Sequence, residues 1–196
     1  LNDTTEFART HMVPSLSADH PKYNEKGRYW QGGVWPGANY MVIDGLYKKD
    51  YKDMAYHVAA NDYANILQIF KDTGTFWEYC APESSEPGFM ARKNFVGWGG
   101  LPPIAEFIEY ILGIHSDRSE DLVTWEMVQT EEHGIDRLPF GTEGQISLRA
   151  AQRSDASQKP VVTVSTNVEF DLVINWAGGT SGKVHVMPGK KQTVRF

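Results

Sequence analysis

The chain has 196 residues, of which 41% are hydrophobic and 22% are charged, so its composition is that of a globular protein and argues against wholesale disorder. Its formal net charge of −6 offers no basic face for nucleic acid, and no apolar run approaches the roughly 20 residues of a membrane-spanning helix. The single cysteine, Cys80, excludes an internal disulfide framework and a multi-thiolate metal site.

Residues 1–115 are expected to form helices joined by long loops. The expected helices cover residues 3–12, 36–48, 50–71 and 102–112. Pro36 suits the first turn of the second helix, and Gly74 closes the third, because glycine readily adopts the conformation that ends helices. On the fourth helix Glu106 and Glu109 share one face, which we expect to be solvated.

Residues 116–196 are expected to form a β-rich domain after a polar linker at residues 116–120. The expected strands cover residues 123–128, 145–150, 161–165, 168–176, 183–187 and 192–196. Residues 188–191 are typical of a turn, so the last two strands are expected to pair as a hairpin. Short strands of this number predict a small antiparallel β-sandwich, and the whole chain is therefore expected to be mainly α followed by β.

Aromatic residues make up 12% of the chain, and four of the six tryptophans lie between residues 30 and 98. Residues 27–40 combine glycines, tryptophans, tyrosines, a glutamine and an asparagine at the entrance to the second helix. Tryptophan and tyrosine present flat apolar faces with a polar edge, and the amide side chains both donate and accept hydrogen bonds. This pattern suits a sugar ring, and a packed aromatic core is the alternative.

Two later segments could also carry chemistry. Glu78 lies between aromatic residues, where the pKa of a carboxylate can be tuned for acid–base catalysis. The alternative for Glu78 is an ordinary loop carboxylate bound to backbone amides. Residues 95–103 place Trp98 among glycines at the start of the fourth helix. The six histidines are scattered without ligand spacing, so we expect no metal and no cofactor, and Cys80 is expected to be a structural thiol.

Three segments taken together resemble a known group of enzymes. Residues 29–40, 76–88 and 95–113 follow one another in the order, and with the gaps, of motifs in the trehalase, family 63 processing glucosidase and mannosylglycerate hydrolase group. The resemblance covers about residues 1–115. It implies an (α/α)6 barrel and an inverting glycoside hydrolase that uses two carboxylic acids and no metal.

The resemblance also implies roles for particular residues. Glu78 lies in the motif that holds the general base of these enzymes. The sugar-binding subsite would be lined by Trp30, Gln31, Gly32, Trp35, Asn39, Tyr40 and Trp98. The segment that carries the general acid has no counterpart in this chain. Residues 1–115 are therefore expected to be the C-terminal portion of the barrel, which would act on an oligosaccharide or small glycoside only together with the N-terminal remainder.

Other interpretations stay open at this point. The chain could be a non-catalytic carbohydrate-binding or structural module derived from the same fold, or part of another α/α-barrel enzyme such as a lyase, epimerase or phosphorylase. Residues 116–196 are expected to pack against the barrel, and a sugar-binding surface at Trp125 or Trp176 is the alternative. The chain opens at Leu1 within an amphipathic pattern, so we expect a longer protein. A signal peptide upstream would place that protein in the periplasm or outside the cell.

Overall fold

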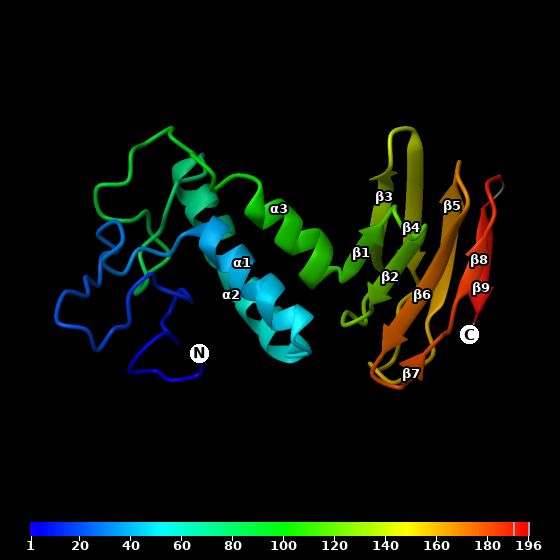
Figure 1. Cartoon of the computed structure of the whole chain (residues 1–196), viewed down its shortest axis with the longest axis horizontal. Coiled ribbons are helices and arrows are strands. Elements are labelled where there is room, and N and C mark those ends of the chain that lie inside the picture. The colour runs from blue at the N-terminus through cyan, green and yellow to red at the C-terminus, as the bar shows by residue number, and fades with distance from the viewer. Residues whose placement is uncertain (190, 196) are drawn as a thin grey trace. The chain divides into compact units, whose positions relative to one another are not determined.

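The computed structural model describes residues 1–189 and 191–195, which divide into two compact units. Unit 1 is Leu1–Tyr110 and unit 2 is Ile111–Phe196, so the division lies five residues before the boundary expected at residue 115. Unit 1 contains the helices and unit 2 the strands (Figure 1). Within the described ranges, none of the helices has the length and apolar character needed to cross a membrane.

The helices of unit 1 follow the expected order from the second one onward. They are α1 (Pro36–Lys48), α2 (Lys52–Thr73), α3 (Pro102–Glu106) and a π-helical turn, η1 (Phe107–Ile111). The helices α1 and α2 pack side by side, and the loops of unit 1 gather at the end where α1 begins and α2 stops (Figure 1). Gly74 ends α2 at a φ of 75°, in the left-handed conformation that glycine tolerates best.

The prediction of a helix over residues 3–12 is wrong, because residues 4–7 form a turn and the rest of this segment is not helical. The side chain of Asp3 accepts a hydrogen bond from the backbone N–H of Thr5, and the backbone carbonyl of Asp3 accepts from Glu6 and Ala8. A short acidic side chain that binds nearby backbone in this way competes with helix formation. The amphipathic pattern around Met12 instead reflects a loop whose apolar side chains reach the core.

Two apolar clusters hold unit 1 together. The first joins α1 and α2 to the loop at Met12 and to η1, and its buried members are Met12, Ile43, Ala55, Val58, Ala59 and Tyr110. The second joins α2 to two loops, through Val34, Ile66, Ile69 and Cys80, with Phe76 and Trp77 packed against it. The second cluster fixes the loop after α2, which contains Glu78, to the helix pair.

The strands of unit 2 form two sheets in the part of the chain that is described. One sheet contains β1 (Ile114–Asp117), β2 (Leu122–Glu126), β6 (Phe170–Trp176), β7 (Gly179–Thr180) and β8 (Val184–Val186). The other contains β3 (His133–Phe140), β4 (Gly144–Ala150), β5 (Val161–Thr166) and β9 (Gln192–Arg195) in that order. Buried side chains alternate with exposed ones along β4 and β6, as expected for strands with one covered face. The rings of Phe140 and Phe170 lie 5.9 Å apart and join the two sheets.

Three sequence-based expectations for unit 2 are wrong. The hairpin of residues 183–187 with 192–196 does not form, because β8 pairs with β6 and β9 pairs with β5 in the other sheet. The expected antiparallel pairing fails for β2 and β6, which are parallel. The strands β1 and β3 were not expected. In β3 the register shifts between Ile135 and Leu138, and Arg137 has a φ of 57°, so a bulge interrupts the alternation that would reveal a strand.

Candidate functional site

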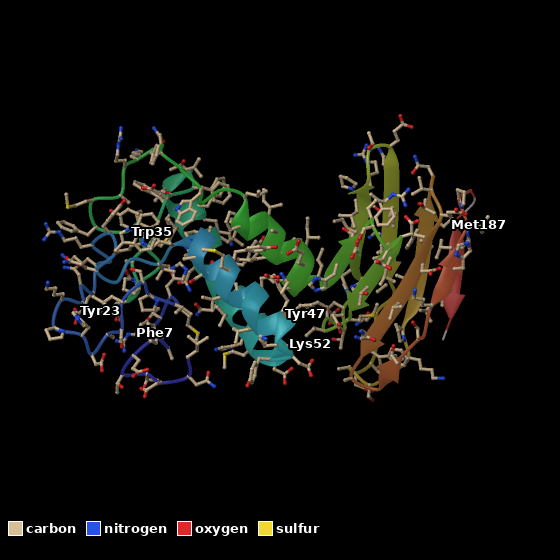
Figure 2. The ribbon with its side chains drawn as sticks, viewed as in Figure 1. Phe7, Tyr23, Trp35, Tyr47, Lys52 and Met187 are labelled. Atoms are coloured by element: carbon tan, nitrogen blue, oxygen red, sulfur yellow. The ribbon has the colours of Figure 1, made fainter. Side chains whose placement is uncertain are left out.

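A stack of aromatic rings marks the end of unit 1 where α1 begins, and Figure 2 labels Trp35 at this place. Trp35 lies between two rings, with its centroid 4.3 Å from that of Trp30 and 4.6 Å from that of Tyr79. Tyr29 and Trp98 meet Trp35 edge-on, at 5.0 Å and 6.0 Å. The sequence therefore brings together three tryptophans that were predicted to bind sugar.

These rings differ sharply in exposure. Trp35 is 2% exposed, whereas Trp30 and Trp98 are each 46% exposed and Tyr29 is 54% exposed. Trp35 is the buried support of the stack and cannot offer a face to a ligand. Trp30, Trp98 and Tyr29 present the accessible aromatic surface that a sugar ring would contact.

Glycines bring Trp98 and Glu78 close to this stack. A Cβ atom on Gly37, in the first turn of α1, would lie 2.8 Å from the ring of Trp98, so only glycine lets this indole lie against the helix. A Cβ atom on Gly97 would lie 2.9 Å from Cγ of Glu78. Gly97 has a φ of 52°, which side chains rarely adopt. The Glu78 side chain thus lies directly against the residue that precedes Trp98.

The loop around Glu78 is fixed on both sides, and the Glu78 side chain is half-buried. Before Glu78, the indole N–H of Trp77 donates to Thr73 Oγ1 over 2.9 Å. After Glu78, Tyr79 is buried and its hydroxyl donates to the backbone carbonyl of Phe89. Burial raises the pKa of Tyr79, and the nearby Glu78 carboxylate raises it further. In the described part of the chain, the Glu78 carboxylate has no hydrogen bond, so the alternative of a carboxylate bound to backbone amides finds no support there.

Two other residues predicted to bind sugar, Asn39 and Tyr40, form hydrogen bonds within the protein. Asn39 is 1% exposed, and its amide donates to the Met12 carbonyl over 2.7 Å and accepts from the Val13 N–H. The Tyr40 hydroxyl donates to Glu109 over 2.6 Å, and burial, followed by this contact, raises the pKa of Tyr40. Both side chains hold the fold of unit 1.

Gln31 and Gly32 belong to the loop that leads into the stack. The backbone N–H of Gln31 donates to the Arg28 carbonyl, and the Gln31 carbonyl accepts from Asn24. Gly32 has a φ of 105°, and a Cβ atom there would lie 2.9 Å from the Asn24 carbonyl. Gly32 is required by this tight turn, and the half-buried side chain of Gln31 stays beside the exposed Trp30.

Sequence reasoning missed a second group of ionisable residues. His11, Asp62 and Glu106 are each 0% exposed, although Glu106 was expected on a solvated face. Nε2 of His11 lies 2.5 Å from Oδ1 of Asp62. The signal available in the sequence was a histidine and an aspartate at positions that otherwise follow an apolar pattern, but only the fold shows that the three meet.

The remaining candidate residues have structural surroundings. Cys80 is buried, and burial raises the pKa of its thiol, so the sulfur is a poor nucleophile. In unit 2, Trp125 is 0% exposed and donates to the Leu112 carbonyl over 2.7 Å, which removes it as a sugar-binding platform. The indole of Trp176 is partly covered by Gly178 and donates to the Ser157 carbonyl.

Comparison with known proteins finds a family match in the N-terminal half of the chain. The family model of the mannosylglycerate hydrolase MGH1-like glycoside hydrolase domain matches residues 1–98, which is half of the chain. No solved structure matches the chain.

The curated relatives are distant and much longer. The chain is 23% identical over 111 residues to a probable mannosyl-oligosaccharide glucosidase of Schizosaccharomyces pombe, covering 52% of this chain and 14% of the relative. It is 38% identical over 72 residues to the mannosylglycerate hydrolase of Thermus thermophilus, covering 37% of this chain and 16% of the relative. An uncharacterized protein of Borreliella burgdorferi is 26% identical over 149 residues, 70% of this chain and 31% of the relative. The chain spans less than a third of the length of each. Because the family model covers half of it, the chain belongs to the MGH1-like glycoside hydrolase family.

Proposed function

We propose that this chain is the C-terminal part of an inverting glycoside hydrolase and that Glu78 is its general base. The observation that carries the proposal is the environment of Glu78. Its carboxylate has no hydrogen bond within the described residues and lies against Gly97. The next residue after Gly97 is Trp98, whose indole is exposed. A base that activates water needs such a free carboxylate beside a surface that holds the sugar.

The reaction requires two carboxyl groups. In an inverting hydrolase one protonates the leaving oxygen while the other takes a proton from water on the opposite face of the sugar, at a separation of roughly 6.5–9.5 Å. Glu78 would supply the second function. The general acid would come from the N-terminal remainder of the barrel, which the resemblance implies is absent here. The exposed faces of Trp30 and Trp98 would hold the ring between the two groups.

The exposed surface of unit 1 supports the barrel-fragment proposal. Leu101, just before α3, is 73% exposed; Ile104 in α3 is 54% exposed, and Phe107 at the start of η1 is 36% exposed. Contiguous apolar surface of this kind indicates a contact with another protein element. We assign it to the remaining helices of an (α/α)6 barrel, with unit 2 as a packing domain.

The test uses the complete reading frame that contains this chain. Mannosylglycerate and mannosyl-oligosaccharides are the first substrates to screen, because the relatives carry these names. Glu78→Gln should lower turnover by about 10²- to 10⁴-fold, with sugar binding retained. The matched control is Glu86→Gln, an exposed carboxylate of the same loop, whose side chain accepts from Ser84 alone among the described residues. Proton NMR of the first product should reveal the inverted anomer, and a retained anomer or normal turnover in Glu78→Gln would overturn the proposal.

The alternative is a non-catalytic sugar-binding module, in which the exposed faces of Trp30 and Trp98 would bind sugar without hydrolysis. Such a module would quench the tryptophan fluorescence of this chain on titration with oligosaccharide. It would also be encoded without further helices or a second carboxylic acid upstream. Saturable quenching with no hydrolysis by the complete protein would establish the module and exclude the hydrolase.

A further inference from the structure

Three ionisable side chains meet in the interior of unit 1, away from the aromatic stack. His11 comes from the loop before α1, Asp62 from the middle of α2 and Glu106 from the end of α3, and each is 0% exposed. His11 Nε2 and Asp62 Oδ1 are 2.5 Å apart. Burial raises the pKa of Glu106, and the neighbouring Asp62 carboxylate raises it further. Groups of this kind are costly to bury, so their place in the core calls for a reason.

The same face of α2 binds the backbone around His11. The side chain of Asn61 accepts from the Met12 N–H over 2.8 Å and donates to the Thr10 carbonyl over 3.0 Å. Asn65, one turn further along, donates to the Thr10 carbonyl as well. The three polar residues of α2 therefore fix the segment from Thr10 to Met12 in one position.

That segment in turn binds the loop that carries Glu78. The His11 backbone N–H donates to the Pro82 carbonyl over 2.8 Å. Ser85 Oγ donates to Asn65 Oδ1 over 2.5 Å, so the loop also reaches α2 directly. The backbone of Cys80 exchanges two hydrogen bonds with Val34, which precedes Trp35. Thus a short chain of bonds leads from Asp62 through His11 to Pro82, four residues after Glu78 in the same loop.

We propose that the buried His11–Asp62 pair is a positioning element that holds the loop of residues 79–88, and with it Glu78, against the aromatic stack. The proposal rests on Glu78 acting as the base, although its structural part can be tested without turnover. A hydrogen bond fixes direction as well as distance, whereas apolar packing at the same place would let the loop slide. A base has to be held to within about 0.5 Å of its productive position, which explains why polar groups occupy the core here.

The test is amide hydrogen exchange on the 196-residue chain, followed residue by residue by NMR. Asp62→Leu removes the acceptor of His11 and keeps a side chain of similar size. The amides of His11 and Ala81 should then exchange about tenfold faster or more, because a buried hydrogen bond to a charged group is lost. The Ile43 amide in α1 should change much less. Equal acceleration at Ile43 would mean a general loss of stability and would overturn the positioning role.

Two variants complete the series. Asp62→Asn keeps an acceptor oxygen for His11, so it should restore most of the protection of the Ala81 amide. If the negative charge of Asp62 held the loop instead, the neutral asparagine would not restore it. Asp72→Leu is the matched control, because Asp72 is exposed on the same helix and, within the described part of the chain, its side chain accepts from Gln68 alone. It should leave exchange at His11 and Ala81 unchanged. Failure of Asp62→Asn to protect Ala81 more than Asp62→Leu would contradict the proposal.

If Asp62→Leu does not fold, the proposal can still be tested on the unmodified chain. In native-state exchange at low denaturant, the His11 and Ala81 amides should open together with one free energy. Independent opening of the two amides would overturn the proposal. These outcomes are separate from those of Glu78→Gln. If the exchange results show that the pair holds the loop but Glu78→Gln keeps normal turnover, only the proposed function is overturned.

Discussion

Unit 1 and unit 2 bury polar groups to very different extents. Among the described residues, the buried polar or charged side chains of unit 1 are His11, Asn39, Asp62, Asn65 and Glu106, whereas those of unit 2 are Arg153 and Thr166. In unit 1, Asn39 binds the loop backbone at Met12 and Asn65 binds it at Thr10, whereas the side chains of His11 and Asp62 bind each other. In unit 2 the core consists of alternating apolar side chains from two sheets.

This difference indicates where precision is needed. A loop has no ladder of its own, so side chains must fix it if it is to carry a reacting group in one position. The strands of unit 2 satisfy one another, and its two buried polar side chains serve the loops. The Arg153 guanidinium donates to the carbonyls of Met127, Gln129, Ala156 and Gln158, and the Thr166 hydroxyl binds the backbone N–H and carbonyl of Val168. The candidate site lies in the unit whose loops depend on buried polar bonds.

The largest expected effect tests whether the two units are independent. Leu148 is 0% exposed in β4, and Leu148→Ala should lower the free energy of unfolding of unit 2 by about 2–5 kcal/mol. Denaturant titration with hydrogen exchange should show faster exchange in β4 and β5 and unchanged exchange at His11 and Ala81. Gln145→Ala, on the exposed face of the same strand, is the control. Faster exchange in both units would mean that they unfold as one.

The sequence predicted the parts of each unit that follow a local rule. Pro36 and Gly74 correctly located the start of α1 and the end of α2, because their backbone preferences are intrinsic. Alternating polar and apolar residues predicted β4 and β5, and residues 168–176 were predicted as a longer strand that includes β6. The first turns failed because Asp3 binds its own neighbours, and β3 was missed because its bulge at Arg137 breaks the period.

The candidate site was predictable only in part. The order of the motifs predicted four site residues that lie close together in the structure: Trp30, Trp35, Trp98 and Glu78. Motif order could not distinguish the buried Trp35 from the exposed Trp98, because the rings that cover Trp35 come from Trp30 and the distant Tyr79. Strand pairing between β2 and β6, and the meeting of His11 with Asp62, join residues about 50 positions apart, which no local pattern encodes.

The second prediction concerns the pH dependence of unit 1. Burial, and then the Asp62 carboxylate, raises the pKa of Glu106. Above the unfolded pKa of about 4.3 the folded state then binds more protons than the unfolded state, so rising pH lowers stability by at most roughly 1.4 kcal/mol per pH unit. Glu106→Gln keeps the shape without the ionisation. It should stabilise unit 1 at pH 7 by on the order of 1–3 kcal/mol and have little effect at pH 4. Equal stability of variant and parent at both pH values would contradict the buried, protonated state.

The smallest expected effect comes from a polar link at the surface of the same loop. Glu83 is only partly buried; its burial opposes ionisation, but the Arg9 guanidinium and the Tyr23 hydroxyl lower its pKa overall. Its contribution is therefore present above pH 4–5 and is lost as the pH falls through the lowered value. Glu83→Gln should cost about 1 kcal/mol at pH 7, and the difference from the parent should be lost at an acidic pH below the lowered pKa of Glu83. Denaturant titration at the two pH values measures it. Because Glu83 and Pro82 are adjacent, a much larger loss than from Asp62→Leu would mean that the half-buried Arg9–Glu83 ion pair, rather than the fully buried His11–Asp62 pair, holds the loop of Glu78.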